Sequence, residues 1–147
     1  MKALLRPELL GLYVNPDDIE AEIRRHDFFD LAALGIATNE SEILEFFRNS
    51  TLLAKADLLD EAAQLSFSDG KFSFFAVVVN SYFASVAADF VRQKLLVARR
   101  SFTFETVMSS PDKVEFLRRA QRMGFRTYLY SLWGQYPAAC GVYLTIC

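Results

Sequence analysis

Histidine and cysteine are scarce in this chain of 147 residues. His26 is the single histidine, and the two cysteines, Cys140 and Cys147, both lie near the carboxyl end. Two thiols in an acidic, phenylalanine-rich chain do not form a disulfide framework, and no group of cysteines and histidines has the spacing of a zinc site. His26 follows an arginine pair and precedes an aspartate, which is typical of a surface helix end. These absences exclude a disulfide-stabilised fold, a zinc site and a histidine-based active site.

The chain also lacks a block of charge of one sign and a long hydrophobic segment of the membrane-spanning kind. Its formal net charge is -2 and its basic residues occur as isolated pairs, which argues against a nucleic-acid partner. The uncharged run 72–88 is interrupted by polar residues and is shorter than the ~20 residues of a spanning helix. The first residues are interrupted too early by Lys2 and Arg6 for a signal peptide. We therefore expect a cytoplasmic protein with no membrane partner.

Apolar residues make up 52% of the chain and phenylalanine occurs 14 times, which is ample material for the core of one domain. The recurring pattern is strand, acidic turn, helix and strand. This pattern predicts an α/β fold with a mostly parallel sheet flanked by helices. The expected strands are 12–14, 102–104 and 126–130, and the expected helices of the core are 16–25, 80–97 and 111–123.

The segment 28–73 is predicted to be a mainly helical insertion. Apolar clusters predict helices over 28–34, 39–47 and 52–65, followed by a polar turn at 66–70 and a strand or hairpin arm at 71–75. The long helix after it should bury one face, formed by Phe83, Val86, Ala87, Phe90 and Val91. The helix that begins at Pro111 should turn Val114, Leu117 and Ala120 inward.

Two of the predicted strands end in acidic residues. The first delivers Asp17 and Asp18, and the second delivers Glu105 with Thr106 and, past a short loop, Ser109. Ligands of open α/β sheets bind beyond the carboxyl ends of the strands, where one carboxylate can accept a proton and another can bind sugar hydroxyls. The spacing alone favours the alternative, in which these acids only complement the positive end of a helix dipole. Both interpretations stay open at this point.

The same two stretches resemble the zeta toxin family of P-loop kinases. Residues 12–19, Leu-Tyr-Val-Asn-Pro-Asp-Asp-Ile, resemble the family's apolar strand followed by Asn-x-Asp and a helix. Residues 101–109, Ser-Phe-Thr-Phe-Glu-Thr-Val-Met-Ser, with the helix and the strand at 124–130, resemble its strand, Glu-Thr, Ser, helix, Gly-Tyr and strand module. The resemblance covers residues 1–130 and makes 28–73 an insertion of a P-loop NTPase-like domain.

The resemblance implies an ATP- and Mg-dependent kinase that phosphorylates a hydroxyl of a UDP-amino-sugar or a similar nucleotide-sugar. Asp17 matches the catalytic base. Glu105 matches the acid that holds the sugar, with Thr106 beside it and Ser109 at the rim of the substrate site. An antitoxin-like protein is the implied protein partner.

The chain departs from the family pattern at both ends. No G-x-x-x-x-G-K-[ST] loop occurs, and the single Gly-Lys pair, Gly70-Lys71, is followed by Phe72 and is expected to be a turn. We therefore interpret the domain as incomplete and expect this chain to bind neither ATP nor Mg and to be inactive. An in-frame phosphate loop encoded upstream of Met1 would make Met1 a mis-assigned start. The alternatives are a non-catalytic remnant and a protein-interaction module.

The end of the chain, 131–147, contains no charged residue and is predicted to be an atypical apolar tail. We interpret it as a frame-shifted terminus, with an ordinary edge strand as the alternative. The strands at Leu12 and Phe102 should then be central and buried, while the tail should pack poorly. On this view deleting 131–147 improves solubility.

Overall fold

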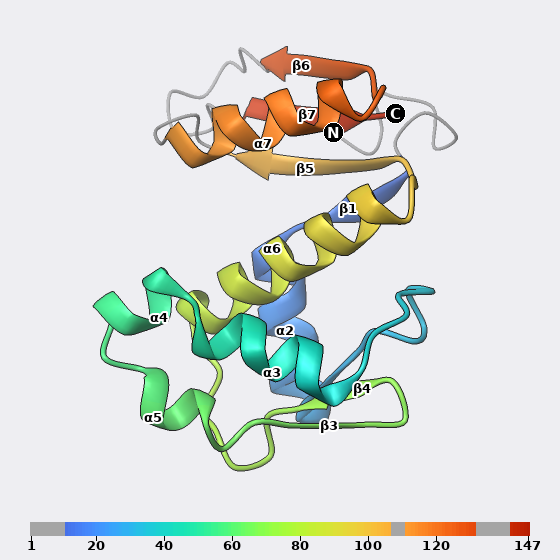
Figure 1. The fold of residues 1–147 in the computed structure, drawn as a ribbon. Helices are drawn as coiled ribbons and strands as arrows, with labels where there is room; N and C mark the ends of the chain where they lie inside the picture. The colour runs from blue at the N-terminus through green and yellow to red at the C-terminus, as the bar shows by residue number, and fades with distance from the viewer. Residues whose placement is uncertain (1–10, 107–110, 132–141) are drawn as a thin grey trace, which may run out of the picture. The chain divides into compact units, whose positions relative to one another are not determined.

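Figure 1 shows the protein as a computed structural model, which describes residues 11–106, 111–131 and 142–147. The chain forms two compact units. Unit 1 combines residues 1–14 with 95–147, and unit 2 consists of residues 15–94. The predicted insertion at 28–73 lies within unit 2, which extends beyond it at both ends.

Unit 1 is built on a four-stranded mixed sheet in the order β1-β5-β7-β6. β1 and β5 are parallel, while β7 runs antiparallel to both β5 and β6. β5 and β6 therefore point the same way, and the chain passes between them through the helix α7 (Figure 1). The bounds of these elements are β1 (Leu12–Val14), β5 (Phe102–Thr106), α7 (Pro111–Arg122), β6 (Thr127–Ser131) and β7 (Val142–Ile146).

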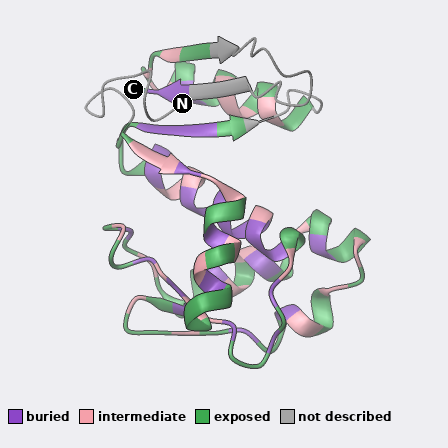
Figure 2. Cartoon of the chain, turned by 180° about the vertical axis from the view of Figure 1, so that it is seen from behind, coloured by how far each residue is buried: buried purple, intermediate pink, exposed green. Residues whose placement is uncertain are grey.

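The core of unit 1 lies between this sheet and α7. The rings of Phe102 and Phe104 on β5 lie 6.2 and 6.0 Å from the ring of Phe116 on α7. Ala120, one turn further along α7, is fully buried, as predicted. Val114 is instead exposed, and its predicted inward position is wrong because Phe116, four residues before Ala120, takes the face that meets the sheet. Figure 2 shows β5 buried along most of its length.

The predicted order of burial in unit 1 is partly wrong. β5 lies between β1 and β7 as expected, but β1 is at the edge of the sheet among the described strands, and its Leu12 and Tyr13 are only half-buried. The expectation of a poorly packed tail is wrong for β7, which lies between β5 and β6 with Ile146 fully buried. An apolar stretch without charges suits a strand with neighbours on both sides. The rest of the predicted tail, 132–141, lies outside the described residues.

Unit 2 combines helices with a three-stranded antiparallel sheet in the order β2-β4-β3. The first helix of this unit, α2, begins at a side-chain cap. Asn15 accepts a hydrogen bond from Asp17 N–H at 2.9 Å, and Pro16 takes the first helical position. The bounds are α2 (Pro16–His26), β2 (Phe28–Asp30), α3 (Glu40–Arg48), α4 (Thr51–Lys55), α5 (Leu59–Ala62), β3 (Ser66–Ser68), β4 (Lys71–Ser73) and α6 (Ser81–Val97), whose last three residues belong to unit 1.

Two predictions in this unit are wrong and a third is partly wrong. Residues 28–34 begin as the strand β2 rather than a helix, because Phe29 finds a pairing partner in Phe72 on β4 and is buried there. The predicted helix 52–65 is two short helices, α4 and α5, separated where Asp57 adopts a left-handed backbone with φ of 58°. The polar turn predicted at 66–70 is confined to residues 69 and 70, because 66–68 form the strand β3. A short apolar run does not distinguish a strand from a buried helix until its neighbours are known.

Phenylalanine rings form the core of unit 2. Phe72 on β4 lies 4.7 Å from Phe47 on α3 and 5.0 Å from Phe74, and Phe74 lies 6.0 Å from Phe83 on α6. Phe46 extends the cluster to Phe90, with ring centroids 5.2 Å apart. The predicted inward face of α6 is confirmed, since the side chains expected there are buried, namely Phe83, Val86, Ala87, Phe90 and Val91.

The fold class is therefore α/β, with two sheets flanked by helices and parallel strands in one of them. The sheet is not mostly parallel as predicted, because β1 and β5 form the one parallel pair among the described strands. No helix in the described ranges is long and apolar enough to cross a membrane.

An ion pair joins α3 to α6 in unit 2 and provides a test by pH. Lys94 Nζ lies 2.8 Å from Glu42 Oε1, and the Thr38 hydroxyl donates to the same carboxylate at 2.6 Å. These hydrogen bonds, from Lys94 first and Thr38 second, lower the pKa of Glu42 below its ordinary value of 4.5. Since the folded pKa is depressed, the stabilisation is fully present above the unfolded pKa and is lost as pH falls through the folded pKa.

We expect Glu42→Gln to lower the free energy of unfolding by no more than ~1 kcal/mol at pH 7, because the carboxylate is partly exposed. The difference from the parent chain should disappear well below pH 4.5, where the parent carboxylate is protonated too. Urea denaturation at pH 7 and at about pH 3 measures both values. Glu45→Gln, on the exposed side of the same helix, is the control. A loss that is equal at both pH values would contradict this account.

Candidate functional site

The carboxyl ends of β1 and β5 meet at one edge of the unit 1 sheet. Their parallel register pairs Leu12 with Phe102 and Val14 with Phe104. The backbone segments that lead into β1 and β5 lie close together at Gly11. Its φ is +57°, and an added Cβ there would lie 2.2 Å from the carbonyl oxygen of Ser101. Because both strands run the same way, the segments that follow Val14 and Phe104 leave the sheet at the same edge. This is the position in which α/β proteins bind ligands.

Glu105 is an exposed carboxylate at this edge. It follows Phe104 directly, and the Tyr13 hydroxyl donates a long hydrogen bond of 3.5 Å to its Oε2. Tyr13 pairs with Thr103 in the register, and Thr103 and Glu105 share one face of β5 because side chains alternate along a strand. The carboxylate can accept hydrogen bonds from the hydroxyls of a ligand while the phenol holds it in place.

Buried residues fix the strand that carries Glu105. On the Glu105 face, the hydroxyls of Thr103 and Thr145 lie 2.7 Å apart and both residues are buried. On the opposite face, Phe102 and Phe104 pack against Phe116. The backbone that positions the carboxylate is thus held from both faces of the sheet. Only the side chain of Glu105 is free to rotate.

Asp17 lies in the first turn of α2, where both it and Asp18 are exposed. Its N–H is bound by Asn15 Oδ1 in the cap of the helix, and its carboxylate is well placed to complement the helix dipole. Asp17 belongs to unit 2 and Glu105 to unit 1. The prediction that the two acids face one cleft therefore stays a prediction.

Of the other two predicted site residues, Thr106 and Ser109, the structure describes only the backbone position of Thr106. Thr106 is the last residue of β5, and its Cα pairs with that of Val142 on β7. Ser109 lies outside the described residues. Tyr13 was not singled out from the sequence, because its approach to Glu105 follows from the β1–β5 register rather than from any motif. The sequence signal that could have indicated Tyr13 is its place one residue before the end of the predicted strand 12–14.

Charge is divided between the two units, which the net charge of the chain conceals. Unit 1 contains nine lysines and arginines and four acids, an excess of five positive charges. Unit 2 contains seven lysines and arginines and fourteen acids, an excess of seven negative charges. The charges of the two units together give the net charge of -2. An anionic ligand is therefore attracted to the unit that contains Glu105.

Among the described residues, the Gly70-Lys71 pair does not have the geometry of a phosphate-binding loop. Gly70 and Lys71 lie at the hairpin between β3 and β4, where Asp69 and Gly70 have φ of 52° and 76°. This confirms the predicted turn, and the pattern is that of a tight hairpin rather than of a loop leading into a helix. The ammonium of Lys71 lies 4.8 Å from the ring centroid of Phe28. Within the described residues, no group of three or more His, Cys, Asp or Glu could hold a metal ion.

Comparison with known proteins returned no relative. No protein-family model, no curated protein and no solved structure matches this chain. The resemblance to zeta toxins consequently rests on the two sequence stretches alone and stays a prediction.

Proposed function

We propose that this chain is a partial zeta-toxin-like kinase domain that binds a nucleotide-sugar or a similar hydroxyl-rich small molecule. The observation that carries this proposal is the parallel pairing of β1 with β5, which brings the two motif-bearing strands to one sheet edge. The β5–α7–β6 connection is consistent with the P-loop NTPase-like topology that the resemblance implies. The positive excess of unit 1 suits the diphosphate of such a ligand.

In this proposal Glu105 accepts hydrogen bonds from the sugar hydroxyls, with Thr106 and Ser109 beside it at the rim. Asp17 is the general base that would accept the proton of the hydroxyl that reacts. ATP supplies the phosphoryl group in the zeta toxin family, but this sequence contains no phosphate-loop motif, and no metal-binding group is found among the described residues. We therefore propose ligand binding without phosphoryl transfer by this chain.

Calorimetric titration tests the ligand proposal. We expect UDP-N-acetylglucosamine to bind the full chain with a dissociation constant below about 1 mM, and ATP with Mg to bind more weakly than that. Glu105→Gln should weaken binding of the sugar nucleotide about tenfold, because a charge-assisted hydrogen bond is replaced by a neutral one. Asp17→Asn should change the affinity less than about threefold, since a base acts on transfer rather than on binding.

Glu115→Gln is the matched control. Glu115 lies in the same unit, is exposed and pairs with Arg122 on α7, so the substitution removes one negative charge away from the proposed site. Its affinity should equal that of the parent chain. Equal weakening by Glu105→Gln and Glu115→Gln would reduce the effect to general electrostatics and contradict a site at the β1–β5 edge.

We also propose a second function, that of a protein-interaction module, on a separate observation. The loop between β4 and α6 exposes Phe75 by 86% and Val78 by 85%. Large apolar side chains presented to solvent in this way are typical of contact surfaces for other proteins. An antitoxin-like protein is the partner class that the resemblance implies. Absence of nucleotide-sugar binding in the titration above would favour this second function.

A further inference from the structure

In the part of the chain that the structure describes, the strand β6 ends the unit 1 sheet without the features that usually protect an edge. Among the described residues no strand pairs with its outer side. Its sequence, Thr-Tyr-Leu-Tyr-Ser, contains no charge and no proline, and Leu129 and Tyr128 are 61% and 42% exposed. Native edge strands are generally blocked by lysine, proline, a bulge or a covering segment, because an open edge is a template for another strand.

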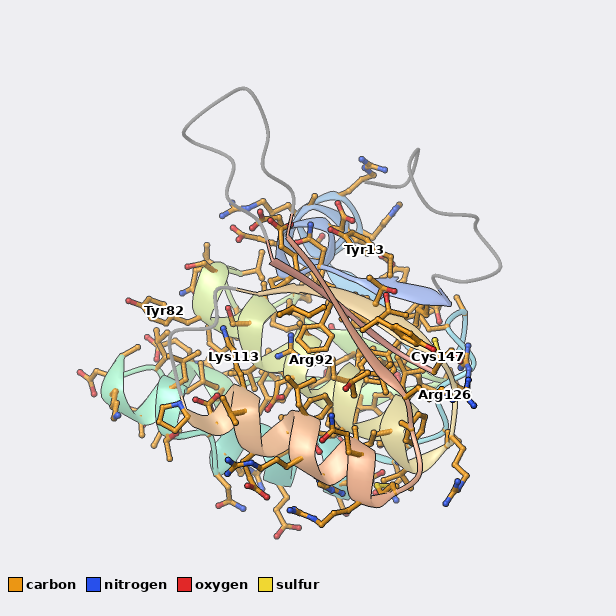
Figure 3. The ribbon with its side chains drawn as sticks, turned by 90° about the horizontal axis from the view of Figure 1, so that it is seen from above. Tyr13, Tyr82, Arg92, Lys113, Arg126 and Cys147 are labelled. Atoms are coloured by element: carbon orange, nitrogen blue, oxygen red, sulfur yellow. The ribbon has the colours of Figure 1, made fainter. Side chains whose placement is uncertain are left out.

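The hydrogen-bond pattern shows which residues of β6 face outward. Arg126 and Cys147 exchange both backbone hydrogen bonds, at 2.8 and 2.9 Å, and are seen side by side in Figure 3. In an antiparallel pair, bonded and non-bonded pairs alternate, so Tyr128 and Tyr130 also direct their backbone groups toward β7. Thr127, Leu129 and Ser131 then direct their N–H and C=O groups to the open side.

The outward-facing residues are symmetric about Leu129. The strand is close to a palindrome, with a hydroxyl residue at each end, a tyrosine next to each end and leucine at the centre. An antiparallel copy centred on Leu129 therefore meets the same residue types in the same order. Each outward N–H of one strand faces an outward C=O of the other. Such self-complementarity is what a two-fold symmetric interface requires.

We infer that β6 pairs antiparallel with β6 of a second copy of this chain, in a register centred on Leu129. The pairing joins two four-stranded sheets into one continuous sheet. It places Leu129 opposite its own copy and Thr127 opposite Ser131 of the partner subunit. The interface is small, so we expect a dissociation constant of the order of 10–100 µM.

Disulfide trapping in the full chain tests the register, with Cys140→Ser and Cys147→Ser as the background. Residues of a hydrogen-bonded antiparallel pair have Cα atoms about 5.5 Å apart, within the range of a disulfide. Leu129→Cys should therefore give a covalent dimer on mild oxidation. Thr127→Cys should not, because its own copy would lie about 14 Å away along the strand. Equal trapping of the two variants would overturn the register.

Sedimentation velocity tests the dimer without cross-linking. Leu129→Lys, which places two like charges face to face, should weaken dimerisation at least tenfold, with circular dichroism unchanged. Val97→Lys is the control, since Val97 is 63% exposed in the same unit but lies on α6. The proposal is overturned by a dimer that Leu129→Lys leaves intact. It is equally overturned by a parent chain that stays monomeric at about 500 µM, an outcome that would leave the edge to a strand of another protein.

Discussion

Removal of residues 132–147 is expected to unfold unit 1, the opposite of the gain in solubility that the sequence suggested. β7 pairs along its whole length with β5 on one side and β6 on the other. Loss of Ile146 alone, which is fully buried, should cost about 2–5 kcal/mol. Loss of β7 also leaves backbone N–H and C=O groups of β5 and β6 without hydrogen-bond partners. The sum reaches the ~5–15 kcal/mol that stabilises a typical domain.

Hydrogen exchange read by mass spectrometry locates the effect. In the shortened chain, amides of β5 should exchange as freely as in an unfolded peptide, while those of β4 and the unit 2 part of α6 should stay protected. Ile146→Ala should reduce the protection of the β5 amides in part. Cys147→Ser, at an exposed position, should leave that protection almost unchanged. Protection of β5 that survives the deletion would show that β7 is dispensable.

Phe72→Ala is expected to be the most damaging single substitution in unit 2. Phe72 is fully buried on the central strand β4, with the rings of Phe47 and Phe74 packed on it at 4.7 and 5.0 Å. Truncation leaves a cavity between α3 and the sheet and removes both aromatic contacts. We expect a loss of about 3–5 kcal/mol. For a unit of this size that corresponds to a fall in Tm of roughly 12–40 °C.

Phe75→Ala is the matched control for this prediction. It removes the same side chain three positions along the sequence, but Phe75 is 86% exposed. Its free energy of unfolding should stay within about 0.5 kcal/mol of the parent value. Thermal denaturation followed by circular dichroism compares the two variants directly. Similar Tm values for Phe72→Ala and Phe75→Ala would contradict the proposed core.

Predictions that rest on local interactions agree closely with the structure. The strand 12–14 is found with the predicted bounds, and Asn15 caps α2 ahead of Pro16. Asn39 and Asn80 likewise accept hydrogen bonds from the first turns of α3 and α6. A cap joins a side chain to an amide two or three residues away, so its geometry is contained in a few consecutive residues.

The candidate site was predictable in part for the same reason. A carboxylate directly after a short apolar strand marks Glu105, and two such strands in a β–α pattern predict parallel pairing at one edge. The contribution of Tyr13 was not predictable, because it depends on which residue of β1 lies beside Thr103. The excess of positive charge in unit 1 was not predictable either, since unit 1 combines two segments that are eighty residues apart in the chain.

Local sequence accounts for the helices with their caps and for the strands that lead to the acidic turns. Tertiary structure decided that 28–30 is a strand and that 142–146 enters the sheet between β5 and β6. The physical reason is that an apolar segment of three to five residues gains little by itself from either conformation. Its state is set by the backbone partners and the buried surface that distant parts of the chain provide.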